Sequence, residues 1–351
     1  MQSVQVGISF VSLWVGVNEG SVIGRSNPAG VRRLGAGGPT VSRVGLGCNN
    51  FGARIGGEAS SAVIGAALES GVTLFDTADV YGGGESERLL GSALQGHRGD
   101  VVIATKFGMP MPGSDPGAPR GRPGYIEQAL EGSLRRLGID TIDLYQIHQP
   151  DPSTPIVETL GCLDEMVHQG KIRWVGCSNF AAWQIADLWW SGQSGGLVKP
   201  VSAQNEFNLL AVGVESSLLP ALNYYQIGLL PYYPLARGLL TGKYRIGEKP
   251  PAGSRLARED APPNALESRR LRGVDAIRRF AGERQLTVVQ VAVAGLLRYS
   301  EVASVITGAT SSSQVVENVA AGSVALSAED WRQLEAVIRE AVVTDGHSTP
   351  T

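Results

Sequence analysis

The chain has 351 residues, 43% of them hydrophobic, and a formal net charge of −3 at pH 7. This length and apolar content are enough for one large α/β domain with an extensive core. Positive and negative residues are mixed along the chain without a long basic block, which argues against a nucleic-acid-binding surface.

Three cysteines, Cys48, Cys162 and Cys177, lie far apart in the sequence. Their odd number and irregular spacing are untypical of a disulfide framework or of a zinc site. Free cysteines are usual in the reducing cytoplasm. We therefore predict a cytoplasmic protein without a bound metal.

The amino-terminal residues differ in character from the rest of the chain. An apolar run over residues 4–17 is not preceded by Lys or Arg and is interrupted by glycine, which argues against both a signal peptide and a membrane span. Residues 19–30 are rich in Gly, Ser, Asn and Pro and have the composition of a linker. We expect residues 1–30 to be a flexible extension outside the fold, residues 31–343 to form one domain, and residues 344–351 to be a tail.

From residue 44 onward, short apolar runs alternate with segments of helical periodicity. The runs of strand length cover residues 44–46, 73–75, 101–104, 143–147, 174–176, 201–203, 227–230 and 304–306. Helical spacing is clear in residues 59–70 and 125–137, and Thr154-Pro155 and residues 287–290 carry helix-start signals. Strands that alternate with helices are typical of a parallel sheet with helical crossovers.

Eight such units predict a single-domain (β/α)8 TIM barrel. A doubly wound sheet is the alternative, but residues 47–52, which follow the first strand, lack the G-x-G-x-x-G fingerprint of a dinucleotide-binding fold. We expect extra helices after strand 7, beyond the polar loop of residues 247–264, and another outside the barrel over residues 328–341.

Polar or special residues follow seven consecutive strands of this predicted barrel, from the second to the eighth. They are Asp76, Thr105 and Lys106, His148, Ser178 and Asn179, Gln204 and Asn205, Tyr232 and Tyr233, and Thr307 and Gly308. Each has an ordinary structural explanation when it is taken alone, such as a turn residue or a satisfied core histidine. Because the carboxyl ends of barrel strands meet at one face, where active sites lie, the whole set predicts a site there.

Residues 75–82 read FDTADVYG, so Tyr81 follows Asp76 closely in the sequence. A free tyrosine has a pKa of about 10, and we expect the ammonium group of Lys106 to lower it. Asp76 would keep this lysine charged, while Tyr81 would act as a general acid and His148 would donate a hydrogen bond to a carbonyl oxygen. This set lacks a source of hydride, so a cofactor is required.

These residues lie in segments that resemble the aldo-keto reductase superfamily. The similar segments are FDTADVYG (75–82), VIATKFG (102–108), DLYQIHQPD (143–151), GKIRWVGCSNF (170–180), SAQNEFN (202–208), PYYPLARGLLTGKY (231–244) and ITGATSSSQVVEN (306–318). The resemblance covers roughly residues 32–341 and is strongest to the branch that contains bacterial general aldo/keto reductases and potassium-channel β-subunits. It implies a barrel without a Rossmann fold, NADPH as cofactor, and a catalytic tetrad of Asp76, Tyr81, Lys106 and His148.

The resemblance also implies where NADPH is bound. The implied contacts are Ser178, Asn179 and Gln204 with the carboxamide, Tyr232 with the nicotinamide ring, Leu235, Arg237, Gly238 and Leu240 with the pyrophosphate, and Gly308, Thr310, Gln314, Glu317 and Asn318 with the adenosine end. Residues 308–314 include no cation, so Lys243 and Arg255 would supply the charge for the 2′-phosphate, as in the branch with the channel subunits. NADPH is therefore favoured over NADH.

The substrate is defined less closely than the cofactor. Asn49, Phe51, Arg54 and Tyr233 either line the substrate pocket or belong to the loop surface, whereas Trp183, Trp189 and Trp190 are more consistent with packing than with substrate stacking. We expect a small carbonyl or sugar-like compound, and neither a nucleic acid nor a membrane as partner. These patterns do not determine the oligomeric state.

Two classes of function agree with these patterns. The first is an NADPH-dependent enzyme that reversibly reduces an aldehyde or a ketone to an alcohol, with Tyr81 as the proton donor. The second is a regulatory subunit that binds the nicotinamide cofactor with little turnover, because regulatory members of the family also keep the tetrad. No hydrophobic docking tail or repeat is evident, which favours the enzyme.

Overall fold

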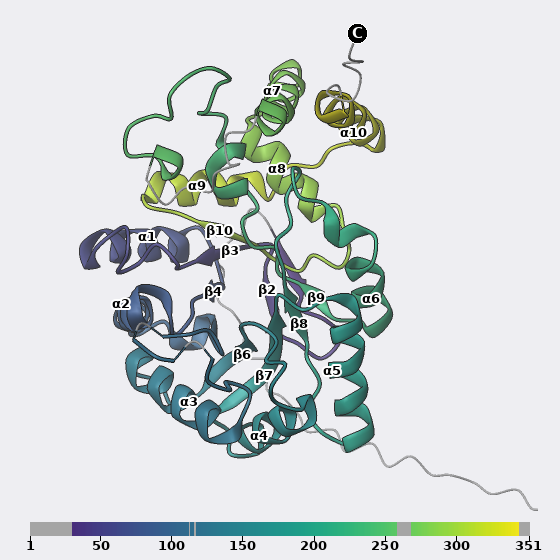
Figure 1. Ribbon diagram of the computed structural model, residues 1–351. Helices are drawn as coiled ribbons and strands as arrows, with labels where there is room; N and C mark the ends of the chain where they lie inside the picture. Colours follow the sequence, from purple (N-terminus) through teal and green to yellow (C-terminus); the bar gives the residue numbers. More distant parts are fainter. Residues whose placement is uncertain (1–29, 112, 116, 258–267, 344–351) are drawn as a thin grey trace, which may run out of the picture.

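The computed structural model describes residues 30–111, 113–115, 117–257 and 268–343. A parallel sheet curls around a central axis and is surrounded by helices (Figure 1). Its strands are β3 (Val44–Gly47), β4 (Leu74–Asp76), β5 (Val102–Phe107), β6 (Ile142–Ile147), β7 (Ile172–Ser178), β8 (Ser202–Gln204), β9 (Gly228–Leu229) and β10 (Val305–Gly308), in the order β10-β3-β4-β5-β6-β7-β8-β9. All eight predicted strands are therefore present. The predicted tail and, except for Gly30, the predicted extension lie outside the described residues.

Backbone hydrogen bonds close the sheet into a barrel between β9 and the segment that leads into β10. The amide of Leu229 donates to the carbonyl of Glu301 at 2.6 Å, and the amide of Ala303 donates to the carbonyl of Leu229 at 3.0 Å. The amide of Ile306 continues this seam by donating to the carbonyl of Pro231 at 3.1 Å. The fold is therefore the predicted (β/α)8 barrel and not a doubly wound sheet.

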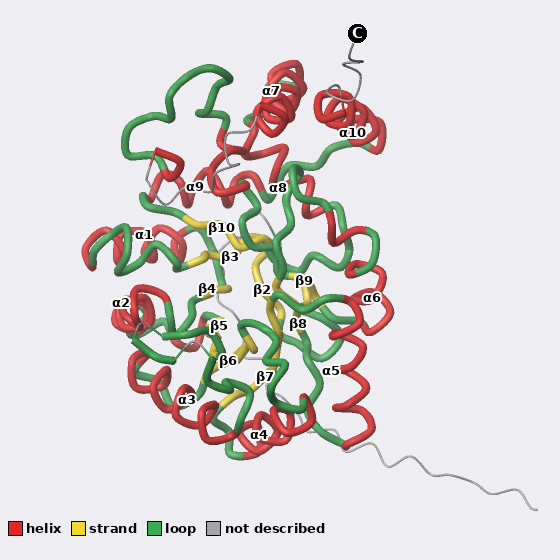
Figure 2. Tube along the Cα trace, in the orientation of Figure 1, coloured by secondary structure: helices red, strands yellow, loops and turns green. Residues whose placement is uncertain are grey.

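Helices connect successive strands and cover the outside of the barrel, as Figure 2 shows. They are α1 (Gly57–Glu69), α2 (Glu85–Ala93), α3 (Pro123–Leu137), α4 (Ile156–His168), α5 (Ala182–Gly195), α6 (Leu218–Tyr225), α8 (Val288–Leu297) and α9 (Ser312–Ala321). Their apolar faces pack on the strands, and Val63, Ile126 and Leu160 are fully buried there. In the described ranges, no helix is both long and apolar enough to cross a membrane.

The two predicted helix starts have different outcomes. The capping box of α8 is confirmed, because Thr287 Oγ1 accepts a hydrogen bond from the amide of Gln290 and the Gln290 side chain accepts one from the amide of Thr287. The predicted cap of α4 is wrong, because that helix begins at Ile156 and the hydroxyl of Thr154 donates to Asp151 instead.

A β-hairpin that the apolar runs do not reveal closes the amino-terminal end of the barrel. Strand β1 (Val31–Arg33) pairs antiparallel with β2 (Thr40–Ser42), and Leu34 between them is buried with Leu74 and other barrel-interior residues. The guanidinium of Arg32 donates to the carbonyl oxygens at positions 299 and 302, at 2.9 and 2.7 Å, and so ties the hairpin to the barrel. Strands of three residues are too short to show a clear periodic pattern in sequence.

Two helices lie outside the barrel, as predicted from the sequence. α7 (Ser268–Glu283) and α10 (Ala328–Val343) pack against one another (Figure 1). Val274, Ile277 and Leu334 from these helices are buried in a second apolar cluster that also includes residues of α8. The cluster fixes the extra helices beside the barrel without changing the order of its strands.

The close contact between α2 and α3 on the outside of the barrel can be tested by mutation. A Cβ added at Gly91 of α2 would lie 2.1 Å from the carbonyl oxygen of Leu137. We expect Gly91→Ala to lower the free energy of unfolding by about 1–3 kcal/mol, because the two helices must separate. Gly65→Ala in α1 is the matched control: its Cβ would meet nothing within 4 Å, and better helix propensity should stabilise by roughly 0.5–1 kcal/mol. Guanidinium denaturation measures both effects, and equal stability of the two variants would contradict the contact.

Candidate active site

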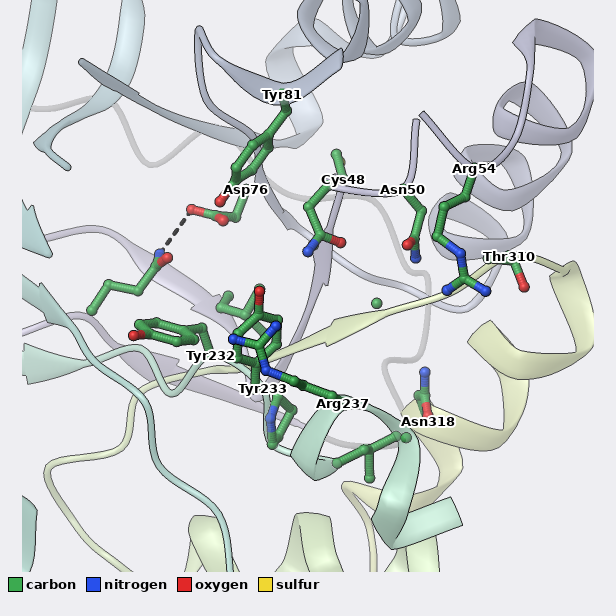
Figure 3. A pocket seen from close by; sticks show the side chains of 18 of the residues that line it. Cys48, Asn50, Arg54, Asp76, Tyr81, Tyr232, Tyr233, Arg237, Thr310 and Asn318 are labelled. Atoms are coloured by element: carbon green, nitrogen blue, oxygen red, sulfur yellow. Dashed lines mark hydrogen bonds between the residues drawn. The ribbon is translucent and has the colours of Figure 1, made fainter. Parts of the chain in front are cut away.

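A cavity of about 700 Å³ opens at the carboxyl ends of the barrel strands (Figure 3). The predicted site residues that line it are Asn49, Arg54, Asp76, Tyr81, His148, Ser178, Asn179, Gln204, Tyr232, Tyr233, Leu235, Arg237, Gly238, Lys243, Gly308, Thr310, Gln314, Glu317 and Asn318. Residues far apart in sequence converge here because the parallel strands of a barrel all end at the same face.

Three predicted residues with described side chains do not line the cavity, and the side chain of a fourth, Arg255, is not described. Phe51 and Leu240 are fully buried in apolar clusters, so Phe51 belongs to the core rather than to a substrate pocket. Lys106 is also fully buried, but its ammonium group reaches Asp76 beneath the cavity. Arg255 begins the 3₁₀ helix η5 (Arg255–Ala257), and its side chain lies outside the described part of the chain.

Further lining residues were not selected from the sequence. They are Gly47, Cys48, Asn50, Met109, Gln149, Pro234, Thr241, Val289 and Ile306. Cys48 and Asn50 adjoin Asn49 in the sequence, and Gln149 adjoins His148, so their positions beside predicted site residues are a signal that points to them. Val289 lies in α8, between the two extra helices α7 and α10 in sequence, and no local pattern relates it to the cavity.

The floor of the cavity is a buried ion pair. Lys106 Nζ lies 2.7 Å from Asp76 Oδ2 and also donates to the carbonyl oxygen of Thr77 at 2.7 Å. Asp76 Oδ1 accepts hydrogen bonds from the side-chain amides of Gln146 at 3.2 Å and Gln204 at 2.8 Å. Both charges therefore have the additional hydrogen bonds that a buried ion pair requires to be stable.

Gln204 has a contact that the resemblance does not imply. Its side-chain amide donates to Asp76, whereas the resemblance implies that it binds the nicotinamide carboxamide. Ser178 and Asn179, the other two residues in that implied contact, bond with one another, with Asn179 Nδ2 donating to Ser178 Oγ at 3.2 Å. Gln204 thus links the implied carboxamide site to the ion pair.

Tyr81 and His148 lie together above the ion pair. The two rings meet edge to face, with centroids 5.8 Å apart, and Lys106 Nζ lies 5.1 Å from the centroid of the tyrosine ring. Tyr81 begins the turn η1 (Tyr81–Gly84), in which Gly82 and Gly83 have φ values of 57° and 65°. Glycine adopts these left-handed angles easily, which lets the chain turn back over the barrel mouth.

Burial determines the protonation of this group of residues. Burial raises the pKa of Tyr81 above 10, and the opposing effect of Lys106 offsets this only in part. The prediction of a lowered tyrosine pKa is therefore wrong in sign for this structure, although the lysine acts in the expected direction. Burial and the charge of Lys106 lower the pKa of His148 to about 3, so its imidazole is neutral at physiological pH.

Lys106 itself remains charged. Burial lowers its pKa, but the nearby Asp76 and Tyr81 raise it by more, and the net direction is upward. A permanent positive charge therefore lies beside a protonated phenol and a neutral imidazole.

Asn179 connects several parts of the cavity wall. Its side chain donates to the carbonyl oxygen of His148 at 2.9 Å and accepts a hydrogen bond from the hydroxyl of Tyr232 at 2.8 Å. Asn179, Tyr233 and Arg237 all have positive φ values, of 63°, 50° and 57°. Such angles are unfavourable for residues other than glycine, and they cluster at functional sites.

Arg54 lies at the other end of the cavity from Tyr81. Figure 3 shows Arg54 and Thr310 toward the same end, and Tyr81 well away from both. The Asn50 side chain donates to the carbonyl of Ala309 at 3.1 Å and so ties the loop of Arg54 to the loop after β10. This placement puts Arg54 at the end of the cavity where the resemblance puts the adenosine, and its part in a substrate pocket stays a prediction. Asn49 and Tyr233 line the cavity as expected.

Comparison with known proteins gives a consistent result. Residues 43–339 match the model described as "Aldo/keto reductase family". The chain is 35% identical over 319 residues to a "Probable voltage-gated potassium channel subunit beta" of Oryza sativa subsp. japonica, covering 88% of this chain and 96% of that protein. It is 33% identical over 308 residues to "Probable aldo-keto reductase 1" of Glycine max, covering 86% and 87%. It is 40% identical over 207 residues to "Aflatoxin B1 aldehyde reductase member 2" of Rattus norvegicus, covering 58% and 55%.

The chain therefore belongs to the aldo/keto reductase family. This confirms the resemblance seen in the sequence. The characteristic reaction of the family is the reduction of a carbonyl group with NAD(P)H.

Asp79, just before Tyr81 in the chain, is another buried carboxyl group near the cavity. It is 2% exposed, and its Oδ1 has no hydrogen-bond partner among the described residues. Burial and the negative charge of Glu87 raise the pKa of Asp79 to about 7. Glu87 is held by Arg136 Nε and by the hydroxyl of Thr105, both at 2.6 Å. Asp79 therefore changes its charge near neutral pH, whereas Glu87 forms an ion pair with Arg136.

The raised pKa of Asp79 makes stability depend on pH. The pKa of its carboxyl is about 7 in the folded protein and 3.8 when unperturbed. The protonated carboxyl therefore contributes fully to the free energy of unfolding below pH 3.8, and this contribution is lost as the pH rises to 7. An amide at this position is uncharged throughout, so we expect the stability of Asp79→Asn relative to wild type to increase by about 2–3 kcal/mol between pH 5 and pH 8. Urea denaturation at both pH values measures this, with Asp140→Asn as an exposed control. A parallel pH dependence of Asp79→Asn and wild type would refute it.

Proposed function

We propose that this protein is an NADPH-dependent oxidoreductase that reversibly reduces an aldehyde or a ketone to an alcohol, with Tyr81 as the proton donor. The observation that carries the proposal is the group at the floor of the cavity: a protonated phenol and a neutral imidazole beside a buried, charged lysine. Family membership supports the reaction type.

Each member of this group has a separate part in the proposed proton transfer. The raised pKa keeps Tyr81 protonated until a carbonyl oxygen accepts its proton. Lys106 stabilises the phenolate that remains, and Asp76 keeps the lysine in place. His148, which is neutral, donates a hydrogen bond to the carbonyl oxygen and orients it.

The described side chains are suited to hold a phosphorylated dinucleotide. Arg54, Arg237 and Lys243 line the cavity and carry positive charge, which phosphate groups require. Gly308, Thr310, Gln314, Glu317 and Asn318 would hold the adenosine end, with Leu235 and Gly238 along the pyrophosphate. Ser178, Asn179 and Tyr232 would hold the nicotinamide, and Arg255 would add charge at the 2′-phosphate. When bound, the reduced nicotinamide supplies the hydride.

A regulatory role is the second candidate. Two relatives that cover most of this chain, from Oryza sativa subsp. japonica and Arabidopsis thaliana, are each named "Probable voltage-gated potassium channel subunit beta". On this alternative the chain would bind the cofactor with little turnover. We favour the enzyme, with a small carbonyl or sugar-like substrate, and a cytoplasmic location, with which the three free, buried cysteines agree.

Removal of one hydroxyl group tests the proposed proton donor. We expect Tyr81→Phe to reduce turnover of aldehydes with NADPH by about 10²–10⁴-fold, because the carbonyl oxygen loses its proton source. Cofactor affinity should stay close to that of wild type, because the ring that packs against His148 is kept. Steady-state NADPH oxidation with an aldehyde panel and fluorescence titration of NADPH measure the two effects. If wild type and Tyr81→Phe turn over equally slowly while both bind NADPH, the regulatory alternative is supported instead.

The cationic lining residues provide a test of the cofactor. We expect Lys243→Met and Arg54→Met each to weaken NADPH binding by about tenfold, or ~1.4 kcal/mol, through loss of a charge that faces phosphate. Lys249→Met is the matched control, because Lys249 is an exposed lysine of the same loop that does not line the cavity. Fluorescence titrations with NADPH and NADH measure the change, and tighter binding of NADH than NADPH by wild type would overturn the assignment of NADPH.

A further inference from the structure

A second hollow lies on the same face of the barrel, beside the main cavity. Its volume is about 280 Å³, and it is formed by the loops that follow β5 and β6 and by the start of α5. Residues that define its walls include Pro150, Pro152, Phe180, Trp183 and Asp187. Gln149, directly after His148 in sequence, lines both the second hollow and the main cavity, so the two are adjacent.

Trp183 is the most unusual residue in this hollow. Its side chain is 70% exposed, although the sequence favours a packing role for it. Trp189 on the same helix does pack, with its ring centroid 5.1 Å from that of Tyr225. An exposed indole in a concave, proline-walled hollow offers a flat surface on which another planar ring can stack.

Asp187 provides a polar group next to this flat surface. It lies four positions after Trp183, so the two side chains are on the same face of α5. Asp187 is exposed, and no ion pair or hydrogen bond joins its carboxylate to another residue of the described ranges. A carboxylate in this position would accept a hydrogen bond from a hydroxyl or an amine on a stacked ring.

The walls of the hollow are already organised. The carboxylate of Asp151 accepts hydrogen bonds from the amides of Arg120 and Gly121, at 2.8 and 2.7 Å, and from the hydroxyl of Thr154 at 2.8 Å. The Arg120 side chain is 5% exposed and donates to the carbonyl of Ala118 at 2.9 Å, so its charge is used within the loop. A hollow that is formed in advance binds a ligand at a lower entropic cost.

We propose that this hollow is a second substrate subsite, which binds a planar aromatic ring with a hydrogen-bond donor at the far end of an elongated carbonyl substrate. The proposal rests on the proposed function, because the carbonyl end of the same molecule would lie at Tyr81 in the adjacent cavity. The volume is sufficient, since a cavity of about 150 Å³ accommodates benzene. Trp183 stacks on the ring and Asp187 accepts the hydrogen bond from its substituent.

This arrangement distinguishes long aromatic substrates from short ones. A short aldehyde reaches Tyr81 without touching Trp183, so its kinetic constants do not depend on the tryptophan. A methyl ketone joined to a 4-hydroxyphenyl ring by a spacer of suitable length gains contacts at the subsite. Those contacts are remote from the reacting carbonyl, so they increase affinity and kcat/KM.

The test compares methyl ketones that carry a 4-hydroxyphenyl, phenyl or alkyl end on spacers of increasing length. In wild type we expect ketones of one spacer length to bind most tightly. At that length, the affinity for the hydroxyphenyl ketone should exceed that for the alkyl ketone roughly tenfold. Trp183→Ala should remove this advantage, and Trp183→Phe should restore most of it. Asp187→Ala, which has no acceptor oxygen, should remove only the preference for hydroxyphenyl over phenyl. Trp190→Ala is the matched control, because Trp190 is 51% exposed on the same helix but lines neither hollow.

Calorimetric dissociation constants are measured with NADP⁺ present, beside the steady-state constants for each ketone and for a short aldehyde. Calorimetry does not need turnover, so it tests the subsite even if Tyr81 proves not to be a proton donor. Absence of any aldehyde reduction would count against the proposed function and not against the subsite. If wild type shows no preference for aromatic ends, or if Trp183→Ala and Trp190→Ala behave alike, the subsite proposal is overturned. A change of oligomeric state in Trp183→Ala without a change in ketone affinity would also overturn it.

Discussion

The buried ion pair between Lys106 and Asp76 is the interaction on which the rest of the site depends. Two opposite charges removed from water are stable only when their geometry is good and their remaining hydrogen bonds are made. Strands β4, β5, β6 and β8 supply these bonds together, through Gln146, Gln204 and the carbonyl of Thr77. The register of neighbouring strands therefore determines whether a positive charge is available beneath the cavity.

Burial and charge act against one another at Tyr81 but together at His148. Burial favours the uncharged forms of both residues. Lys106 pulls the tyrosine toward its phenolate, and it repels a proton from the histidine and so adds to the effect of burial there. The result is a phenol that keeps its proton beside a cation that would stabilise the phenolate once the proton is transferred. Asp79, just before Tyr81 in the chain, adds a carboxyl whose charge changes near neutral pH. A proton site of this kind arises from the low dielectric of the barrel interior and not from any one residue.

The loops around the barrel mouth divide the surface into regions of different chemistry. Tyr81 and the ion pair occupy one end of the main cavity, and Arg54 and Thr310 mark the other, where the loops after β3 and β10 are joined. The second hollow, with Trp183, lies beside it on the loops after β5 and β6. The rigid barrel holds all of these loops in fixed relative positions, which allows one fold to combine a single type of chemistry with a variable choice of substrate.

The eight alternating strands and helices, the capping box of α8 and the polar residues at the strand ends could all be predicted from the sequence, because they depend on local periodicity and chain order. Where each side chain points, and how deeply it is buried, depends on the packing of the folded chain. Phe51 lies in the core, Arg54 at the far end of the cavity and Trp183 in the open, although all three follow or adjoin strand ends. The sign of the pKa shift of Tyr81 was likewise decided by burial. Desolvation and distance depend on neighbours from other strands and loops, and no local pattern in the chain contains them.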